Sequence, residues 1–506
     1  MSDSLVKTNY SKGLITLFVM ITTIMQVMDM TIANVALPYM KGSISATQDQ
    51  ISWVLTSYII SAAIMTQPVS WFVERFGRRK VFLISVIGFT LASMLCGMAS
   101  SIEEIVIFRI LQGIFGAALV PLSQSTLLDI NPKEKHGSAM AIWGMGVMVG
   151  PIVGPALGGY LTEYYNWRWV FYINVPLGII ACLGIMFFLP DSKKVKNYFN
   201  ITGFALLSIA IASLQLMLDR GQQLDWFNSH EIVIYCGLTI ASLWVFIIHI
   251  IYSKKPFIST VLFKDLNFMI SVLLIFIVSV IFLATLALLP PFMSMMGYPV
   301  FDIGILIAPR GIGTFIAMMV IGKLINKVDP RLLVLLGLIL TVIALYRMSG
   351  FTTFVPQNMI IITGIINGLG MGFIFVPLST VAFSTLPLKN RVEATSFFSL
   401  IRNIGSSIGV SIVTSLLIRN TQINHAYLSE SITSSKFWIM KHYLPQFMHL
   451  SDGMVYNILD KNITQQAMTI GYIDDFKIMM ICVLLSAPLI LLLRNPYKDK
   501  NIDIKR

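Results

Sequence analysis

Charged residues are scarce in this sequence of 506 residues, at 12% of the chain against about 25% in a typical soluble domain. Because 56% of the residues are hydrophobic as well, a water-soluble enzyme is excluded. Cysteine is also scarce, and all four cysteines lie inside apolar runs, so neither a disulfide framework nor a zinc site follows from them. The chain lacks a Gly-x-x-x-x-Gly-Lys-Ser/Thr loop, so ATP is not its direct energy source.

Catalytic constellations are missing too. The six histidines are scattered through predicted loops and span ends, and none stands with an acid in an arrangement that supports catalysis. A membrane-embedded transferase is therefore disfavoured, and we expect no enzyme activity, no metal and no cofactor. A receptor or scaffold that transports nothing is disfavoured by the intramembrane charges and the glycine-rich span described below.

Long uncharged runs are what the sequence has in abundance. Runs of roughly 20 residues match the thickness of a hydrocarbon core and indicate transmembrane helices. Between charged residues they predict an all-α polytopic membrane protein with fourteen spans. The spans are expected near 14–36, 51–71, 81–100, 105–127, 137–161, 170–189, 201–218, 232–252, 268–289, 303–321, 332–349, 359–383, 394–418 and 476–493.

Basic residues gather in alternate loops. An even number of spans puts both termini on one side, and if that side is the cytoplasm, the outward loops hold little beyond Lys41, Arg168 and Arg220. This bias explains the net charge of +12 without any nucleic acid, and it predicts cytoplasmic termini. One outward segment, residues 420–475, is long and includes an amphipathic stretch at 437–448. It is either a small cap over the last spans or a docking surface for a partner.

The two halves of the sequence repeat each other at an offset of about 255 residues. They predict two related six-helix bundles, residues 1–198 and 261–506, joined by a two-helix insertion at 199–260. The matching positions are Pro132 with Pro387, Gly150 with Gly405, Gly154 with Gly409, and Gln112-Gly113 with Asn367-Gly368.

The intramembrane charges do not repeat. Arg109 corresponds to Gly364, and the span at 268–289 has no acid to match Asp29. At about 1.5 Å per residue, Asp29 and Arg109 lie at similar depths, roughly 6 and 9 Å outward of the membrane midpoint. A carboxylate that gains and loses its arginine as a cavity changes sides is a proton carrier, so we predict proton coupling at this pair. A permanent interhelical ion pair is the alternative.

Polar residues and tryptophan within the spans predict a substrate cavity. The 29 methionines suit walls that accept many shapes, and apolar walls suit lipophilic compounds. Arg310 lies close to the outer face, so it either meets anionic substrates or extends to the interface. The predicted lining residues are Gln26, Asn34, Gln112, Trp143, Arg310, Asn367 and Arg402.

Two motifs predict gating. One span carries glycines at four-residue spacing, which stacks them on one helix face for close packing, with two prolines between them that permit bending. The loop before residue 80 holds an acid, arginines and a turn glycine, which predicts ion pairs that close the cytoplasmic side. The alternatives are simple packing and charge that only sets topology. The gating residues are Gly146, Gly150, Pro151, Gly154, Pro155 and Gly158 in the span and Glu74, Arg75, Gly77 and Arg78 in the loop.

Several motifs together resemble the fourteen-span drug:proton antiporters of the major facilitator superfamily, in the branch of EmrB-like multidrug exporters. In that family pattern, Asp29 matches the acidic position of the first span and Arg109 the arginine of the fourth. Ser70 and Glu74 depart from the usual glycine and aspartate of the loop. The motifs are Asp29–Pro38, Ser70–Lys80, Arg109–Gly113, Gly146–Gly159, Trp167–Pro176 and Leu218–Phe227.

The resemblance implies a major facilitator fold in a bacterial inner membrane and alternating access by rocking of the two bundles. It implies proton-driven export of lipophilic toxic compounds. It further implies an EmrA-like periplasmic adaptor and a TolC-like outer-membrane channel as partners in a tripartite pump. A dedicated exporter of one metabolite or siderophore on the same scaffold is the alternative.

Overall fold

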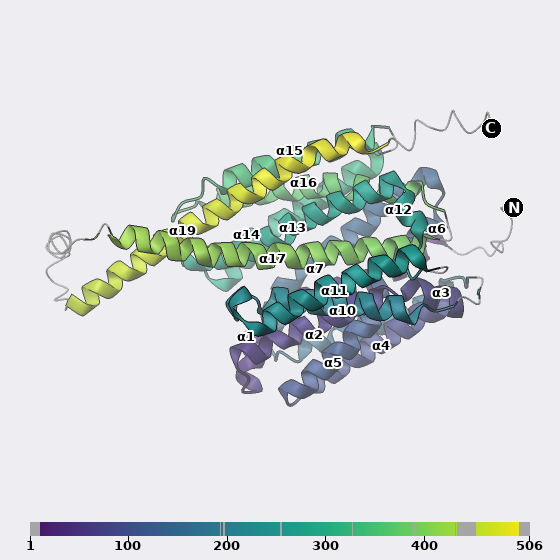
Figure 1. The fold of residues 1–506 in the computed structure, drawn as a ribbon, viewed down its shortest axis with the longest axis horizontal. Coiled ribbons are helices and arrows are strands. Elements are labelled where there is room, and N and C mark those ends of the chain that lie inside the picture. Colours follow the sequence, from purple (N-terminus) through teal and green to yellow (C-terminus); the bar gives the residue numbers. More distant parts are fainter. Residues whose placement is uncertain are drawn as a thin grey trace.

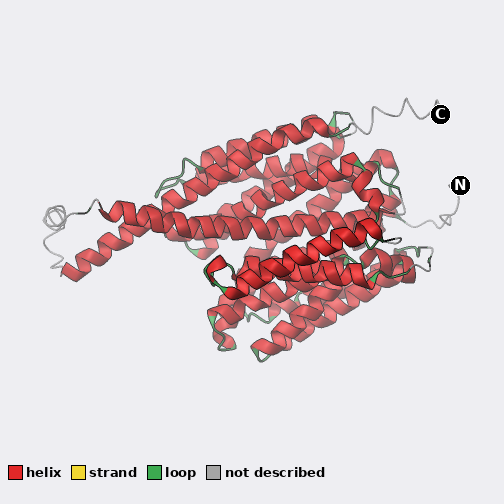
Figure 2. Ribbon diagram, viewed as in Figure 1, coloured by secondary structure: helices red, strands yellow, loops and turns green. Residues whose placement is uncertain are grey.

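The computed structural model describes residues 11–192, 194–195, 198–253, 256–325, 327–387, 390–430, 432 and 452–494. Within these ranges the chain forms helices and loops and no strand (Figure 2). Thirteen helices are long and apolar enough to cross a membrane, and α2 (Gln48–Thr66) adds a shorter apolar stretch at Gln50–Thr66. With α2 counted as the remaining span, the predicted all-α polytopic architecture is confirmed.

The first bundle is built around α1, which packs against α7 and α9. α5 lies between α2 and α4, so the helices that carry the predicted acid and arginine belong to one compact group. Its helices are α1 (Lys12–Ser43), α2, α3 (Val69–Phe76), α4 (Arg78–Met98), α5 (Ile102–Gly116), α6 (Leu119–Ile130), α7 (His136–Tyr164), α8 (Trp169–Tyr172) and α9 (Asn174–Phe188).

The second bundle repeats this arrangement. α16 packs between α14 and α15, α13 packs on α17, and α19 lies against α15 and α17. Its helices are α13 (Leu266–Met295), α14 (Val300–Leu324), α15 (Pro330–Met348), α16 (Gln357–Ser384), α17 (Arg391–Glu430), α19 (Asp452–Ser486) and the 3-10 helix η5 (Ala487–Leu492), preceded by the short α12 (Thr260–Lys264).

The inserted pair, α10 (Ile201–Arg220) and α11 (His230–Tyr252), lies over the seam between the bundles (Figure 1). α10 packs on α2 of the first bundle and on α17 of the second. Near the C-terminal end of α10, Thr56 donates to the Asp219 carboxylate at 2.6 Å, and Ser411 donates to the carbonyl oxygen of Leu218 at 2.9 Å. The insertion is therefore bonded to both halves.

The start of α1 and the end of η5 lie at the same end of the molecule, which we call the terminal face; the opposite end is the distal face (Figure 1). At the distal face α17 and α19 run on well past the other helices. We call residues 420–430 and 452–466 the arm. The arm projects away from the rest of the molecule, and the helix that contains the predicted last span begins at Asp452, well before the predicted residue 476. The predicted amphipathic stretch at 437–448 lies outside the described residues.

Candidate functional site

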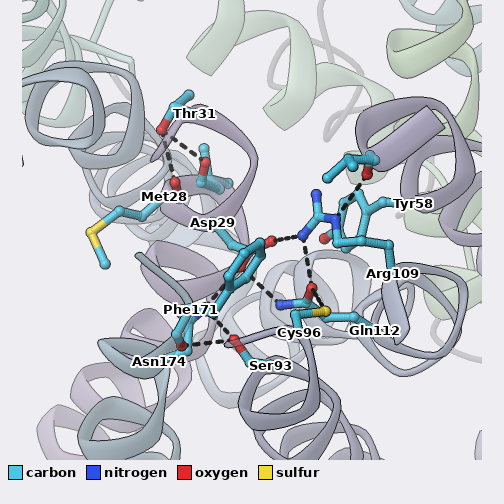
Figure 3. A network of polar contacts seen from close by, with 12 residues as sticks. Met28, Asp29, Thr31, Tyr58, Ser93, Cys96, Arg109, Gln112, Phe171 and Asn174 are labelled. Carbon is cyan, nitrogen blue, oxygen red and sulfur yellow. Dashed lines mark hydrogen bonds and ion pairs between the residues drawn. The ribbon is translucent and has the colours of Figure 1, made fainter. Parts of the chain in front are cut away.

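Asp29 on α1 and Arg109 on α5 form a buried ion pair in the first bundle. Arg109 Nη1 lies 2.6 Å from Asp29 Oδ2, and the two side chains, arginine and aspartate, are 0% and 1% exposed. The other carboxylate oxygen accepts hydrogen bonds at 2.8 Å from Gln112 Nε2 and from Asn174 Nδ2 (Figure 3). The structure thus brings the two predicted charges together, and both carboxylate oxygens are satisfied.

Arg109 has further partners that do not depend on Asp29. Its Nε donates to the carbonyl oxygen of Val54 at 3.0 Å, and its Nη1 donates to Gln112 Oε1 at 2.7 Å. The guanidinium carbon lies 4.2 Å from the centre of the Tyr58 ring, a cation–π geometry. These contacts with α2 and α5 would hold the guanidinium in place even without its ion pair to Asp29.

Asn174 was missed by the sequence analysis as a functional residue. It lies at the start of α9, and its side-chain amide joins the Asp29 carboxylate to Ser93 on α4 at 2.9 Å. Gln112 was predicted to line a substrate cavity, but it belongs to the same charge network. The sequence did contain a signal for Asn174, because it is a polar residue in an otherwise apolar run, inside the motif that ends at Pro176.

The four predicted gating glycines of α7 all face α1. A Cβ on Gly150 would lie 2.9 Å from the backbone nitrogen of Met28, and one on Gly154 would lie 2.0 Å from Thr31 Oγ1. Thr31 also donates to the carbonyl oxygen of Gly150 at 3.1 Å. Helix α7 continues through both of its prolines. The glycines therefore fit α7 closely against the helix that carries Asp29.

Other predicted cavity residues lie apart from the ion pair. Gln26 accepts a hydrogen bond from the backbone of Val120 at 3.1 Å. Trp143 donates to Ser123 at 2.9 Å, and its ring stacks on Phe375 of the second bundle with centroids 5.8 Å apart. Asn34 is exposed near the distal end of α1. Trp143 thus joins the two halves, while Asn34 stands outside the packed interior.

Arg310 on α14 is buried in the second bundle, at 4% exposure, so it does not extend to the interface. Its Nη2 donates to the carbonyl oxygen of Phe282 at 3.2 Å, and its guanidinium lies 4.7 Å from that ring. Among the described residues, Arg310 Nε and Nη1 have no hydrogen-bond partner, and neither does either amide atom of the buried Asn367. Arg402 on α17 is half-buried. Within its described part, the second bundle therefore holds a guanidinium without a carboxylate.

Ion pairs join the two bundles at the terminal face. Asp129, at the end of α6, pairs with Arg78 of the predicted loop and, at 2.8 Å, with Arg391 at the start of α17. We call Arg78, Asp129 and Arg391 the terminal latch. Asp129 was not among the gating residues that the sequence analysis predicted. The Glu74 carbonyl oxygen accepts a hydrogen bond from Val195, and Arg75 is exposed.

Gly77 forms the turn of this loop with a φ of +92°, a left-handed conformation that favours glycine. A Cβ there would lie 2.4 Å from Asp191 Oδ1. The turn therefore holds the start of α4, and with it Arg78, against the end of the first bundle.

No cluster of three or more metal-ligating side chains occurs in the part of the chain that the structure describes. The groups that bond to Asp29 are a guanidinium and two side-chain amides, all of them hydrogen-bond donors. Donors stabilise a carboxylate, whereas a metal ion needs acceptor atoms around it.

Comparison with known proteins places the chain in a family. The model of the Major Facilitator Superfamily matches residues 19–410. The chain is 34% identical to the multidrug export protein EmrB of Haemophilus influenzae, with 92% of each chain covered, and 36% identical to EmrB of Escherichia coli, with 83% of each covered. It is 33% identical to the fatty acid resistance protein FarB of Neisseria gonorrhoeae, with 96% of each covered.

Solved structures agree on the fold. The proton:xylose symporter XylE superposes with a TM-score of 0.59 at 13% identity, covering 93% of this chain and 94% of the symporter. A bacterial homologue of the lysosomal transporter Spinster, in an inward-facing form, gives a TM-score of 0.55 at 17% identity, covering 96% of this chain and 98% of the homologue. With its family model, its relatives and its fold in agreement, the chain belongs to the Major Facilitator Superfamily as a multi-span membrane transporter related to multidrug exporters, and it is not an enzyme.

Proposed function

We propose that the chain exports lipophilic toxic compounds in exchange for protons by alternating access. The observation that carries this proposal is the fully buried pair of Asp29 and Arg109, because buried ionisable residues inside membrane proteins mark ion and substrate pathways. The EmrB relatives, which are named as multidrug exporters, support the export of drugs.

Proton binding at Asp29 is the coupling step. A proton that enters from outside binds a carboxylate oxygen of Asp29, which removes its negative charge and its Coulomb attraction for Arg109. The guanidinium then remains on Val54, Gln112 and the Tyr58 ring. When the cavity opens inward, Arg109 again approaches the carboxyl group and the proton leaves to the cytoplasm. A potential of 100 mV supplies about 2.3 kcal/mol for each proton that crosses.

The glycine contact transmits this change. Thr31, which follows Asp29 and Met30 on α1, bonds to the backbone of Gly150, so a shift of α1 moves α7 with it. The other face of α7 lies on the second bundle, where Ser138 donates to the carbonyl oxygen of Gly322 at 2.8 Å. Protonation in the first bundle is thereby coupled to the interface with the second.

The described cross-bundle contacts support a state closed at the terminal face. Arg391 reaches Asp129, and Thr395 donates to the carbonyl oxygen of Pro121 at 3.2 Å. We place the terminal face in the cytoplasm, since its loops hold most of the basic residues. This state is then the one in which substrate leaves and protons enter from outside.

Arg310 favours substrates that carry a negative charge on a lipophilic body. An unpaired buried guanidinium is costly, and an incoming anionic group would satisfy its Nε and Nη1. FarB, which is named for fatty acid resistance, is one relative consistent with this choice. A dedicated exporter of one metabolite or siderophore would use the same residues, and transport assays on a panel of compounds distinguish it by a single accepted substrate.

The arm suits a partner outside the membrane. It consists of two helices that project from the distal face (Figure 1), where an EmrA-like adaptor leading to a TolC-like channel would bind. Deleting residues 430–465 should weaken co-purification with the adaptor and leave substrate binding unchanged. Unchanged co-purification contradicts this role of the arm.

The Asp29→Asn variant tests the coupling. It keeps the size of the side chain and cannot exchange a proton, so uptake of a lipophilic dye into inverted vesicles under a pH gradient should be lost. The exposed Glu163 on α7 provides the matched control, since Glu163→Gln removes an acid outside the network and should transport normally. Undiminished uptake by folded Asp29→Asn protein overturns the proposal.

A further inference from the structure

Asp475, on α19, is a second buried acid that the proposed mechanism does not use. Its side chain is buried, at 0% exposure, and neither carboxylate oxygen has a hydrogen-bond partner among the described residues. Asp29, in contrast, has partners on both oxygens. Asp475 lies on the stretch of α19 that packs against α15, α17 and α13.

Aromatic rings surround this stretch of α19. Tyr472 contacts Phe292 of α13 with ring centroids 4.9 Å apart, and Phe476 contacts Phe351, just after α15, at 6.3 Å. Phe292 and Phe351 stack on each other at 5.9 Å. Tyr472 lies about one turn before Asp475, and Phe476 follows it directly. The acid therefore lies in the packed part of α19 that follows the arm, on a stretch whose neighbouring residues belong to an aromatic layer.

Among the described residues, no cation compensates Asp475. Helix α13 has no charged residue between Leu266 and Met295, and Arg347 of α15 and Arg419 of α17 are both exposed. On α19 itself, the neighbouring Asp474 is more accessible and bonds to Lys477 at 3.3 Å. Tyr472 is the remaining titratable group beside it, and it is neutral at ordinary pH.

An ionised carboxylate in such surroundings is strongly disfavoured, and a buried acid without a partner takes up a proton instead. We propose that Asp475 is a second proton-binding site of this chain, filled from the distal side and occupied in the closed state described above. Loss of that proton places an unpaired negative charge between α19 and the aromatic layer, which loosens the base of the arm. The proton on Asp475 thus makes the packing of the arm respond to the pH outside.

Infrared spectroscopy of the full-length protein in lipid tests the site directly. The wild type should show a carbonyl stretch from a protonated carboxyl group in this region, and Asp475→Asn should lose that band. Asp474→Asn is the matched control and should retain the band. Asp29→Asn should retain it as well. Asp475→Glu, which keeps an acid, should shift the band. A spectrum that Asp475→Asn leaves unchanged overturns the proposal.

Transport separates this site from the proton carrier. Asp475→Asn should export dye in vesicles but respond less than the wild type, by at least about twofold, to a change in pH on the distal side. Asp29→Asn should not export at any pH. If Asp475→Asn responds to that pH as the wild type does, the assignment is wrong even where the coupling at Asp29 holds.

Discussion

The two bundles share a scaffold and differ in how they treat buried charge. In the first, Arg109 has its carboxylate, the amide oxygen of Gln112, a backbone carbonyl oxygen and an aromatic ring around it. In the second, Arg310 has one carbonyl oxygen and a ring, and no acid among the described residues. Ala284 stands at the position that the repeat assigns to the counterpart of Asp29. A duplicated fold can thus keep a balanced pair in one half and an unbalanced cation in the other.

Gly150 and Gly154 show the opposite behaviour, because Gly405 and Gly409 stand at the matching positions of the second half. A Cβ on Gly150 would lie 2.9 Å from Met28 N, and one on Gly405 would lie 2.7 Å from the carbonyl oxygen of Phe276. Each glycine presses its helix against the first helix of its own bundle, α7 on α1 and α17 on α13. Packing is therefore what the repeat preserves, and charge is where the two halves diverge.

The largest expected effect follows from removing Arg109, with the removal of Arg310 as the comparison. Arg109→Leu leaves a buried carboxylate without its cation, which should cost about 3–5 kcal/mol in the free energy of unfolding. Arg310→Leu removes a charge that has no partner, so stability should stay the same or rise. Thermal unfolding of the purified proteins in detergent measures both. Equal losses in the two variants would contradict the contrast between the bundles.

Arg310→Leu also tests substrate charge. Export of lipophilic carboxylic acids should fall roughly tenfold or more, since a charged hydrogen bond is worth about 1.5–3 kcal/mol. Export of neutral lipophiles should be unchanged, and the exposed Arg347 gives the control variant Arg347→Leu. A uniform loss for all compounds would point to damage of the fold.

The glycine positions should respond alike. Gly150→Ala and Gly405→Ala each force a methyl group into backbone of the neighbouring helix, at an expected cost of about 1–3 kcal/mol. A methyl group added at Gly159 or Gly237 would meet nothing within 4 Å, so the alanine variants at these two positions serve as controls. Unfolding in detergent compares the four. If only Gly150→Ala is destabilised, the claim that the two bundles share this close helix packing is wrong.

The smallest effect should come from the terminal latch. Asp129→Asn weakens two partly exposed ion pairs worth about 1 kcal/mol, so the closed state should lose population by roughly fivefold. A distance measurement by spin labels at the terminal ends of the two bundles reports this shift. Glu163→Gln removes an exposed acid at the distal end of α7 and should leave the distances unchanged.

The sequence predicted the pair of Asp29 and Arg109 because a charge inside an apolar run is conspicuous, and helical rise sets its depth. Asn174 was not predicted, since an uncharged amide in a motif carries no such signal. Asp129 lies beside the basic loop at Lys133 and Lys135, where it resembles a solvated acid, and its partner Arg391 is far away in the chain. Only the folded structure brings them together.

Asp475 illustrates the same limit from another side. The polar composition before it predicted an outward segment that ends at residue 475, yet α19 is one helix from Asp452 to Ser486. This acid is buried in a stretch of α19 that packs against α13, α15 and α17, helices that lie far from it in the sequence. Composition along one helix therefore locates the membrane boundary only approximately, because neighbouring helices decide which polar residue is covered.

Helix α17 is continuous over 40 residues, from Arg391 in the terminal latch to Glu430 in the arm. At about 1.5 Å per residue it is a rod of about 60 Å, pivoting where it is packed most tightly. A tilt of only a few degrees when the latch opens displaces the far end of this rod by several ångströms. In the proposed cycle, opening at the terminal face would therefore move the arm, and an adaptor bound to the arm would be displaced at each turnover.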